Sequence, residues 1–288
     1  MKKFDAAVIG GDRRTAYMVL FLEKRGYRII CYGTQMVEGT RRETANSLRE
    51  AVESAQNVIG GIPLLKNGKL WGGADLKEED RDTQVLFQAL SKGQRLFAGV
   101  IPEALAGECE KKGVICHDYM KEETIAVFNA VATAEGAIAQ AISNKDTNLH
   151  GSRVLVLGYG RCGRVLCEKL KGLSARVTVC TRNPEEGAWA RAMGIERMDF
   201  PAPGSEKEKL NLFDYVFTTV PAVILKEAEL EKMNREALII DIASGPGGVD
   251  YEAADRIGIK ALQCLGLPGR YAPKTSADCL AEFTAGLL

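Results

Sequence analysis

The 288-residue chain has no excess of charge of either sign, because 38 Lys and Arg residues balance 38 Asp and Glu residues. Without a basic field, the chain is a poor candidate for a nucleic-acid binder or for a polycation at a membrane surface. Histidine is scarce, at two residues. Neither histidine has cysteines or carboxylates at ligand spacing, so no metal site is predicted.

The eight cysteines form no Cys-x-x-Cys pair, and the chain is too long for a small disulfide-stapled domain. We interpret them as reduced core residues of a cytoplasmic protein. Two lysines near the N-terminus are followed by no apolar segment of the signal-peptide kind, so no signal peptide is expected. Residues 124–142 are apolar enough to examine as a membrane span, but the polar residues among them favour a buried helix.

Short apolar runs typical of strands alternate with helical segments along the whole chain. In the first half the runs cover residues 4–9, 28–32, 57–59, 95–98 and 114–116, with helices predicted at 15–25, 43–55, 83–92 and 103–112. In the second half they cover 153–157, 176–180, 215–219, 238–242 and 259–264, with helices at 161–171, 185–193, 226–233 and 250–257. This alternation predicts an α/β protein with two Rossmann-like, doubly wound parallel-sheet domains and a cleft between them.

The polar residues 144–148, which follow a long helical segment, indicate where the chain divides. We expect an N-terminal Rossmann-like substrate domain over residues 1–123, a long interdomain helix over 124–144, and a dinucleotide-binding Rossmann domain over 145–272. Residues 273–288 are predicted to form a terminal helix that packs on the first domain.

The strongest motif is the hexapeptide that runs from Gly158 through Tyr159, Gly160, Arg161 and Cys162 to Gly163. It follows an apolar strand and opens a helix, which is the context that the G-x-G-x-x-G fingerprint requires. The first glycine makes the tight turn, the second lets the backbone approach a pyrophosphate, and the third allows the helix to pack on the strand. The free N–H groups at the helix start favour phosphate, so the motif predicts dinucleotide binding.

The end of the next strand selects the dinucleotide. An NAD-specific site usually has an acidic residue here for the ribose 2′-hydroxyl, whereas this sequence continues with Thr181, Arg182 and Asn183. We therefore predict NADP(H), with NAD(H) less favoured. If Arg182 is instead a solvated residue stacked on adenine, both cofactors could bind.

Two later loops should line the cofactor, because ligands of open α/β sheets bind beyond the carboxyl ends of the strands. The residues expected there are Thr219, Val220, Pro221, Ala243 and Ser244. Asp241 ends an apolar run, and it is equally consistent with a structural cap and with a functional residue.

Candidate catalytic residues lie in and before the 124–143 helix. A helical projection gives an apolar arc that includes Val127, Phe128 and Ile142, and Glu135 falls in its middle. A carboxylate there is costly unless it is paired or protonated. Glu135 is therefore either bonded to a specific partner between the domains or a tuned acid or base. Asn129 and Thr133 face another side, towards the expected cleft, and His117 follows a strand as a further acid–base candidate.

Cations near expected cleft loops are candidates to hold substrate carboxylates. Arg270 and Lys274 lie in a late loop that opens a helix, and Arg13 and Arg14 follow an early glycine pair. Asp12, in the same early turn, is a further substrate-binding candidate.

Nearly the whole chain resembles the dipicolinate synthase A-subunit family of spore-forming bacteria. The resemblance is carried by residues 8–13, 129–136, 150–160, 241–250 and 266–275. The last two segments together are specific, while 150–160 is shared with many dehydrogenases. Ala132 stands where the family pattern has proline, so the start of the helix can differ, but Asn129, Thr133, Glu135 and Gly136 are retained.

The resemblance implies an NADP-linked oxidation of a dihydrodipicolinate, derived from 4-hydroxy-tetrahydrodipicolinate by loss of water, to dipicolinate during sporulation. It also implies a second, flavoprotein-like B-subunit as partner and a location in the mother-cell cytosol. We further expect the chain to form a homo-oligomer. Arg13, Arg14, Arg270 and Lys274 would be the donors for the two substrate carboxylates.

Two alternatives remain open. One is another two-domain NAD(P)-dependent dehydrogenase of a hydroxy or amino acid, although the hydroxy-acid enzymes need a late histidine and none follows His150. The other is a non-catalytic nucleotide sensor, which would bind the cofactor without turnover.

Overall fold

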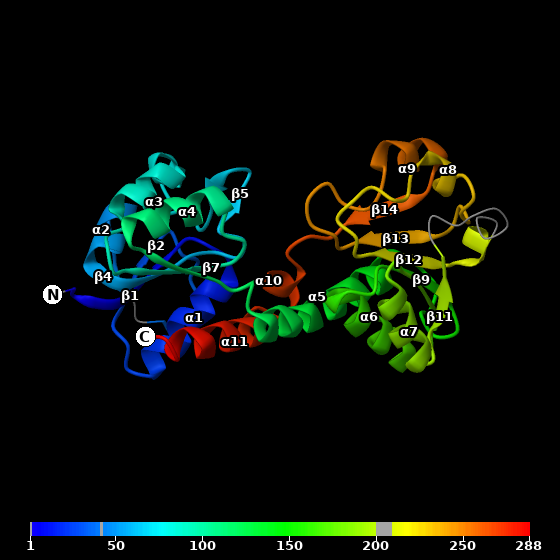
Figure 1. Ribbon diagram of the computed structural model, residues 1–288, viewed down its shortest axis with the longest axis horizontal. Coiled ribbons are helices and arrows are strands. Elements are labelled where there is room, and N and C mark those ends of the chain that lie inside the picture. Colours follow the sequence, from blue (N-terminus) through cyan, green and yellow to red (C-terminus); the bar gives the residue numbers. More distant parts are fainter. Residues whose placement is uncertain (1, 41–42, 200–208) are drawn as a thin grey trace. The chain divides into compact units, whose positions relative to one another are not determined.

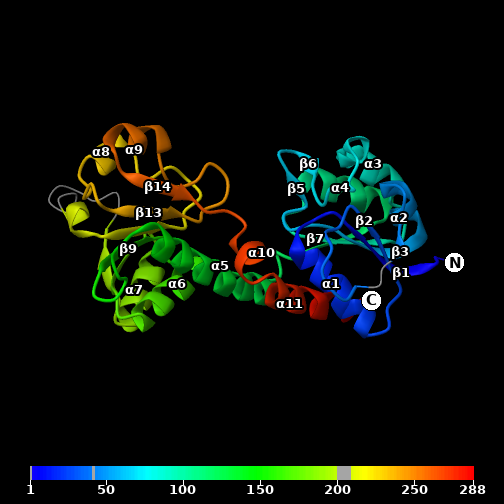
Figure 2. The same cartoon turned by 180° about the vertical axis from the view of Figure 1, so that it is seen from behind.

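The computed structural model describes residues 2–40, 43–199 and 209–288. The chain divides into two compact units (Figures 1 and 2). Unit 1 consists of Met1–Phe128 and Ala272–Leu288, and unit 2 of Asn129–Tyr271. One helix, α5 (Glu123–Asn144), begins in unit 1 and ends in unit 2.

Unit 1 contains a parallel six-stranded sheet with the order β3-β2-β1-β4-β7-β8. The central strands β1 and β4 are mostly buried, as expected where helices cover both faces. Its elements are β1 (Phe4–Ile9), α1 (Arg13–Lys24), β2 (Ile29–Tyr32), β3 (Glu43–Thr44), α2 (Leu48–Ser54), β4 (Ala55–Ile59), the hairpin β5 (Leu65–Lys66) and β6 (Lys69–Leu70), the 3-10 helix η1 (Glu78–Arg81), α3 (Thr83–Ala89), β7 (Arg95–Ala98), α4 (Glu103–Lys112) and β8 (Ile115–Asp118).

The last helix, α11 (Pro273–Ala285), belongs to unit 1 and packs against α1. Met18 and Leu22 of α1 share a buried cluster with Ala277 and Leu280 of α11. The first and last helices of the chain therefore meet in one core.

Unit 2 repeats the same strand order, as β11-β10-β9-β12-β13-β14, again with parallel pairs throughout. In Figure 1, α6 and α7 lie on one face of this sheet, and α8 and α9 lie on the other. Its elements are β9 (Arg153–Leu157), α6 (Arg161–Gly172), β10 (Arg176–Cys180), α7 (Pro184–Ala192), β11 (Glu196–Met198), β12 (Tyr215–Thr218), α8 (Glu227–Leu230), β13 (Leu238–Asp241), α9 (Tyr251–Ile257), β14 (Lys260–Gln263) and α10 (Leu267–Tyr271).

The predicted class of fold, with two Rossmann-like parallel-sheet domains, is confirmed. The helix predicted at 43–55 is wrong at its start, because Glu43–Thr44 pairs with β2 as an edge strand. The helix begins only at Leu48, where the Ser47 hydroxyl accepts a bond from the Glu50 N–H at 3.1 Å. This Ser-x-x-Glu signature of a helix start was present in the sequence.

Helix α5 buries a different face from the one predicted. Its fully buried stripe consists of alanines, namely Ala130, Ala134, Ala137 and Ala141. Val127, Phe128 and Ile142, which the helical projection placed in the buried arc, are 41, 41 and 58% exposed. The small side chains face the core because they let the helix approach its neighbours closely. Of the helices in the described ranges, α5 alone is long and apolar enough to cross a membrane, a property that core helices of soluble proteins share.

Candidate functional site

A pocket of about 520 Å³ opens in unit 2 beyond the carboxyl ends of β9, β10 and β12. Several predicted cofactor-binding residues line it: Gly158, Tyr159, Gly160, Thr181, Arg182, Asn183, Thr219, Val220 and Pro221. The sequence reasoning missed further lining residues: Leu157, Cys180, Glu186, Val223, Ile224, Lys226 and Glu229. Leu157 and Cys180 are the last residues of β9 and β10, and the others lie in the loop after β12 or at the starts of α7 and α8.

The three motif glycines have three different surroundings. Gly158 has φ +96°, and an added Cβ would lie 2.4 Å from the Thr219 hydroxyl oxygen. A Cβ on Gly163 would lie 2.2 Å from the Gly158 carbonyl oxygen, so this glycine allows the close approach of helix and turn. A Cβ on Gly160, in contrast, would meet no atom within 4 Å. Gly160 therefore leaves the backbone open towards the pocket, as the approach of a pyrophosphate requires.

The amino end of α6 faces this open turn. Gly160 is the N-cap of the helix and has no side chain with which to accept a hydrogen bond from the first turn. The first turn also contains no acidic residue. Uncapped N–H groups and the positive end of the helix dipole together favour an anion at this position.

The end of β10 supplies groups of both charges. Arg182 is exposed and lines the pocket. The Thr181 hydroxyl donates to the carboxylate of Glu186, which also lines the pocket. The expectation that no acidic residue lies near this strand end is therefore wrong. Glu186 is in the first turn of α7, one helical turn beyond the Asn183 cap, and counting to that turn in the sequence would have revealed it.

The loop after β13 is held by Asp241. This fully buried carboxylate accepts bonds from the Ala243 N–H at 2.9 Å, the Gly248 N–H at 2.7 Å and the Tyr251 hydroxyl at 2.7 Å. Burial and the bond to Asp241 raise the pKa of Tyr251. Of the two interpretations of Asp241, these contacts favour the structural cap. Ala243 is buried, and Ser244 is exposed outside the pocket lining.

The other cofactor candidates, Arg161, Cys162 and Gly163, form the first turn of α6 but do not line the pocket with the preceding glycines. Burial raises the pKa of the Cys162 thiol. These residues can contribute backbone N–H groups at the helix end rather than side-chain contacts.

The catalytic candidates on α5 lie outside the pocket lining. The Glu135 carboxylate forms an ion pair with Lys169 of α6 at 2.7 Å, and its side chain is 55% exposed. The expectation that Glu135 sits within a buried apolar stripe is therefore wrong, because that face of α5 is open. The Thr133 hydroxyl donates to the Asn129 carbonyl one turn earlier at 2.9 Å, which satisfies it within the helix.

His117, Arg270 and Lys274 are candidates from outside both α5 and the early glycine turn. His117 in β8 stacks on Phe97 at 4.7 Å between ring centroids, and Phe283 of α11 packs against it edge-on. Burial lowers the pKa of His117, so the imidazole is neutral near neutrality. Arg270 and Lys274 are exposed on α10, which belongs to unit 2, and α11.

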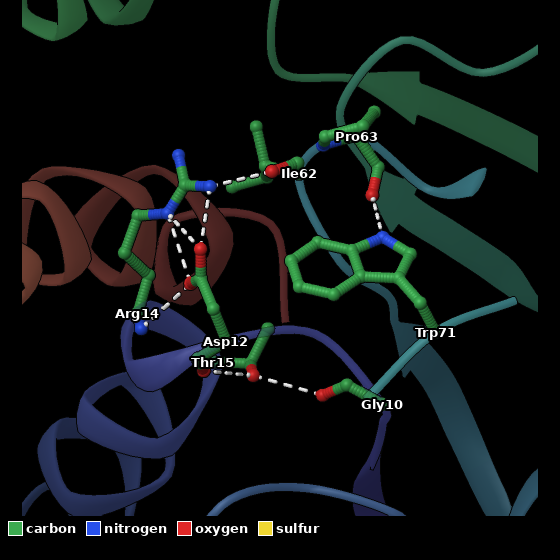
Figure 3. Close-up of polar contacts among 7 residues, drawn as sticks. All are labelled: Gly10, Asp12, Arg14, Thr15, Ile62, Pro63 and Trp71. Carbon is green, nitrogen blue, oxygen red and sulfur yellow. Dashed lines mark hydrogen bonds and ion pairs between the residues drawn. The ribbon is translucent and has the colours of Figure 1, made fainter. Parts of the chain in front are cut away.

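The early glycine turn forms a compact polar cluster (Figure 3). Asp12 is the N-cap of α1 and forms an ion pair with the buried Arg14 at 2.8 Å. Arg13 is exposed, with its guanidinium 5.8 Å from the centre of the Tyr17 ring.

The glycine turn of unit 1 is filled by the loop that follows β4. The Gly11 N–H donates to the Trp71 carbonyl at 2.7 Å, and a Cβ on Gly10 would lie 2.3 Å from that oxygen. The Gly73 N–H similarly donates to the Gly33 carbonyl at 2.6 Å. The position at which unit 2 opens its pocket is thus occupied in unit 1 by the chain itself.

The fold and the site define a class, the NAD(P)-dependent oxidoreductases built from two Rossmann-like domains. Residues 125–254 match the model of the NAD-binding domain of D-isomer specific 2-hydroxyacid dehydrogenases. Residues 5–120 match the model of the N-terminal domain of the dipicolinate synthase A-subunit. The chain belongs to the dipicolinate synthase A-subunit family.

Individual relatives agree with this assignment. The dipicolinate synthase A-subunit of Bacillus subtilis is 37% identical over 197 residues, which are 67% of this chain and 64% of that protein. The aligned part is therefore slightly less than two thirds of the relative's length. The solved structure of the dipicolinate synthase A-subunit from Bacillus halodurans has a TM-score of 0.86 at 28% identity and covers 99% of this chain and 98% of its own. The corresponding Bacillus subtilis structure has a TM-score of 0.84 at 28% identity, with coverages of 100% and 96%.

Proposed function

We propose that this protein oxidises a dihydrodipicolinate to dipicolinate with a nicotinamide cofactor. The substrate would arise from 4-hydroxy-tetrahydrodipicolinate by loss of water. The observation that carries the proposal is the open glycine turn of unit 2, with its uncapped helix end, in the same chain as an N-terminal domain of the dipicolinate synthase type. The 37% sequence identity to the A-subunit of a dipicolinate synthase supports the choice of substrate.

In this proposal, unit 2 holds the pyrophosphate of the cofactor through backbone N–H groups. The N–H groups at the start of α6 would bind the pyrophosphate, and Gly160 would let it approach. The nicotinamide, when bound, accepts a hydride. Thr219, Val220 and Pro221 line the pocket beyond β12 and would exclude water from the dinucleotide.

The chain's own groups would hold the substrate carboxylates and remove a ring proton, after which aromatisation favours the product. Arg13, Arg14, Arg270 and Lys274 are the donors considered for the carboxylates. His117 suits the base because its lowered pKa keeps the imidazole unprotonated. Asn129, Thr133 and Glu135 remain candidates for contacts with the substrate.

We further propose NADP(H) as the cofactor, with NAD(H) less favoured. Arg182 and Thr181 line the pocket at the end of β10, where a 2′-phosphate would bind. Glu186 acts against this preference, because its carboxylate would repel a phosphate and would suit a 2′-hydroxyl. Arg182 must outweigh Glu186 for the preference to hold.

The family also supports a proposal for the cellular setting. We propose a cytoplasmic protein of the sporulating mother cell that forms a homo-oligomer and works with a flavoprotein-like B-subunit. The names of the relatives describe one subunit of a synthase, which supports a multi-subunit enzyme.

A coupled assay tests the function. Dihydrodipicolinate synthase would generate the substrate, and NADPH absorbance and dipicolinate would be followed with this protein, with and without its flavoprotein-like partner. We expect cofactor-dependent dipicolinate formation in step with NADPH formation. Cofactor binding without turnover under both conditions would instead favour a nucleotide sensor.

A further inference from the structure

The sheet of unit 1 has its own ligand position. Its strand order reverses between β1 and β4, and ligands of open α/β sheets bind beyond the carboxyl ends of the strands at this switch point. Arg14, in the first turn of α1, meets the Ile62 carbonyl of the loop after β4 at this point. The loop that fills the turn leaves no place for a dinucleotide there, but it does not cover Arg14 completely.

Arg14 is 3% exposed and its guanidinium is held from two sides (Figure 3). Its Nε lies 3.0 and 3.2 Å from the two carboxylate oxygens of Asp12, and its Nη2 lies 2.8 Å from Oδ2. The same Nη2 donates to the Ile62 carbonyl. These contacts account for the hydrogens on two of the three guanidinium nitrogens.

The third nitrogen, Nη1, points away from Asp12 in Figure 3 and has no hydrogen-bond partner among the described residues. Nη1 is nevertheless not fully buried, so this nitrogen retains contact with solvent. A buried guanidinium normally uses its donors, because an unmade bond to a charged group is costly. Two free donors on an otherwise fixed arginine indicate a binding position for an acceptor.

The surroundings of Arg14 are rigid. The Pro63 carbonyl accepts from the Trp71 indole N–H at 2.7 Å, which holds the loop next to the Ile62 carbonyl. The Thr15 hydroxyl donates to the Gly10 carbonyl at 2.9 Å, which holds the turn on the other side. Arg14 is thus fixed before a ligand arrives, which reduces the entropy cost of binding. Arg13 has no such support, since it is exposed beside Tyr17.

We propose that Arg14 is the residue that binds a substrate carboxylate, through Nη1, and that Asp12 is a positioning residue which fixes the guanidinium. This proposal rests on the proposed function, because it takes the bound carboxylate to be one of the two on a pyridine dicarboxylate. Asp12 leaves the pair without net charge, so the site suits a carboxylate with one negative charge better than a phosphate with two.

The experiment uses the full chain and measures dipicolinate binding by calorimetry, NADPH binding by fluorescence, and the steady-state kinetics of the coupled assay. Arg14→Lys keeps the charge but loses the outward nitrogen. We expect it to weaken dipicolinate binding and raise KM about 10- to 100-fold, with NADPH affinity unchanged. Arg49→Lys, at an exposed arginine paired with Glu53, is the matched control and should leave all three quantities unchanged.

Asp12→Asn tests positioning, because asparagine still caps α1 but no longer neutralises Arg14. We expect KM to rise several-fold with kcat nearly unchanged, and inorganic phosphate to become a better inhibitor as the site gains net positive charge. A purely structural role would lower the melting temperature without changing the response to phosphate.

Three outcomes would overturn the proposal. They are normal dipicolinate binding by folded Arg14→Lys, loss of binding in Arg13→Lys instead, and an unchanged phosphate response in Asp12→Asn. If Arg14→Lys fails to fold, the double variant Asp12→Asn with Arg14→Gln removes both charges of the pair together, and its dipicolinate affinity decides in the same way.

The function and the inference fail in different ways. Turnover of dihydrodipicolinate by wild type and Arg14→Lys with the same KM would leave the function standing and overturn the role of Arg14. A wild type that neither binds dipicolinate nor turns over its precursor would overturn the function. Binding of malonate by that protein, lost in Arg14→Lys, would still support a carboxylate site at Arg14.

Discussion

The two units have the same strand order, but they differ at the amino end of the helix that follows their central strand, α1 in unit 1 and α6 in unit 2. In unit 1, Asp12 caps α1 with its own carboxylate, and the loop around Trp71 fills the glycine turn. In unit 2, Gly160 leaves the end of α6 without a side-chain cap, and the turn opens into a pocket. The same fold therefore has an internal anion at one helix end and a place for an external anion at the other. What a Rossmann-like unit binds depends on its first turn and not on its topology.

The largest expected effect comes from making unit 2 resemble unit 1. Gly160→Asp would place a carboxylate where the pyrophosphate is proposed to bind, at a position with extended backbone and free space for a Cβ. We expect NADPH affinity to fall about 100-fold or more, since like charges about 4 Å apart repel by several kcal/mol near a protein surface. Fluorescence titration measures the loss.

Gly160→Asn is the matched control, because it adds a cap of the same size without charge. It should lose much less affinity than Gly160→Asp, and both variants should keep or exceed the wild-type melting temperature. Similar losses in the two variants would show that space, rather than the helix end, governs binding.

A substitution in the glycine turn of unit 1 should lower stability and leave the affinity for the cofactor unchanged. Gly10→Ala adds a Cβ 2.3 Å from the Trp71 carbonyl at a residue with φ +58°. We expect the free energy of unfolding to fall by about 2 kcal/mol or more, because both the clash and the left-handed backbone oppose the side chain. Urea denaturation measures the change. Unaltered stability would mean that the loop does not pack on the turn as described.

Substitutions inside the pocket should separate NADPH binding from NADH binding. Arg182→Glu should weaken NADPH binding about tenfold or more, and NADH binding much less, because only NADPH has the 2′-phosphate. Glu186→Gln should shift the ratio in the opposite direction, by removing the opposing carboxylate. Equal losses for both nucleotides in Arg182→Glu would contradict the role given to Arg182.

The smallest expected effect is the pH dependence contributed by His117. Burial lowers its pKa from 6.5 in the folded protein, so the unfolded chain binds the proton more readily. Stability from this residue is present above about pH 6.5 and declines as the pH falls towards the folded pKa. His117→Phe, which can keep the stacking on Phe97, should show a smaller drop in melting temperature between about pH 7 and pH 5. An identical drop in wild type and variant would count against a buried neutral imidazole.

Much of unit 2 could be predicted because its signals are local. The spacing of Gly158, Gly160 and Gly163 after an apolar strand predicted a turn whose three glycines have three distinct surroundings in the structure. The proximity of Glu186 to Thr181 was not predicted, because it arises from the first turn of α7, which places the Glu186 carboxylate beside the Thr181 hydroxyl. The orientation of α5 was not predicted either, since hydropathy ranks Val127 and Phe128 above the alanines that pack in the core.

The two parallel sheets, most of their helices and the glycine turn of unit 2 could be predicted from the amino-acid sequence, because hydrophobic periodicity and glycine spacing act over a few residues. The filling of the glycine turn of unit 1, in contrast, depends on the folded chain. Gly10 and Gly11 resemble a ligand-binding turn in sequence, and they are closed by Trp71, sixty residues further along the chain. The fixed orientation of Arg14 likewise depends on the distant Ile62 carbonyl. Contacts of this kind arise from packing between remote segments, and no local pattern records them.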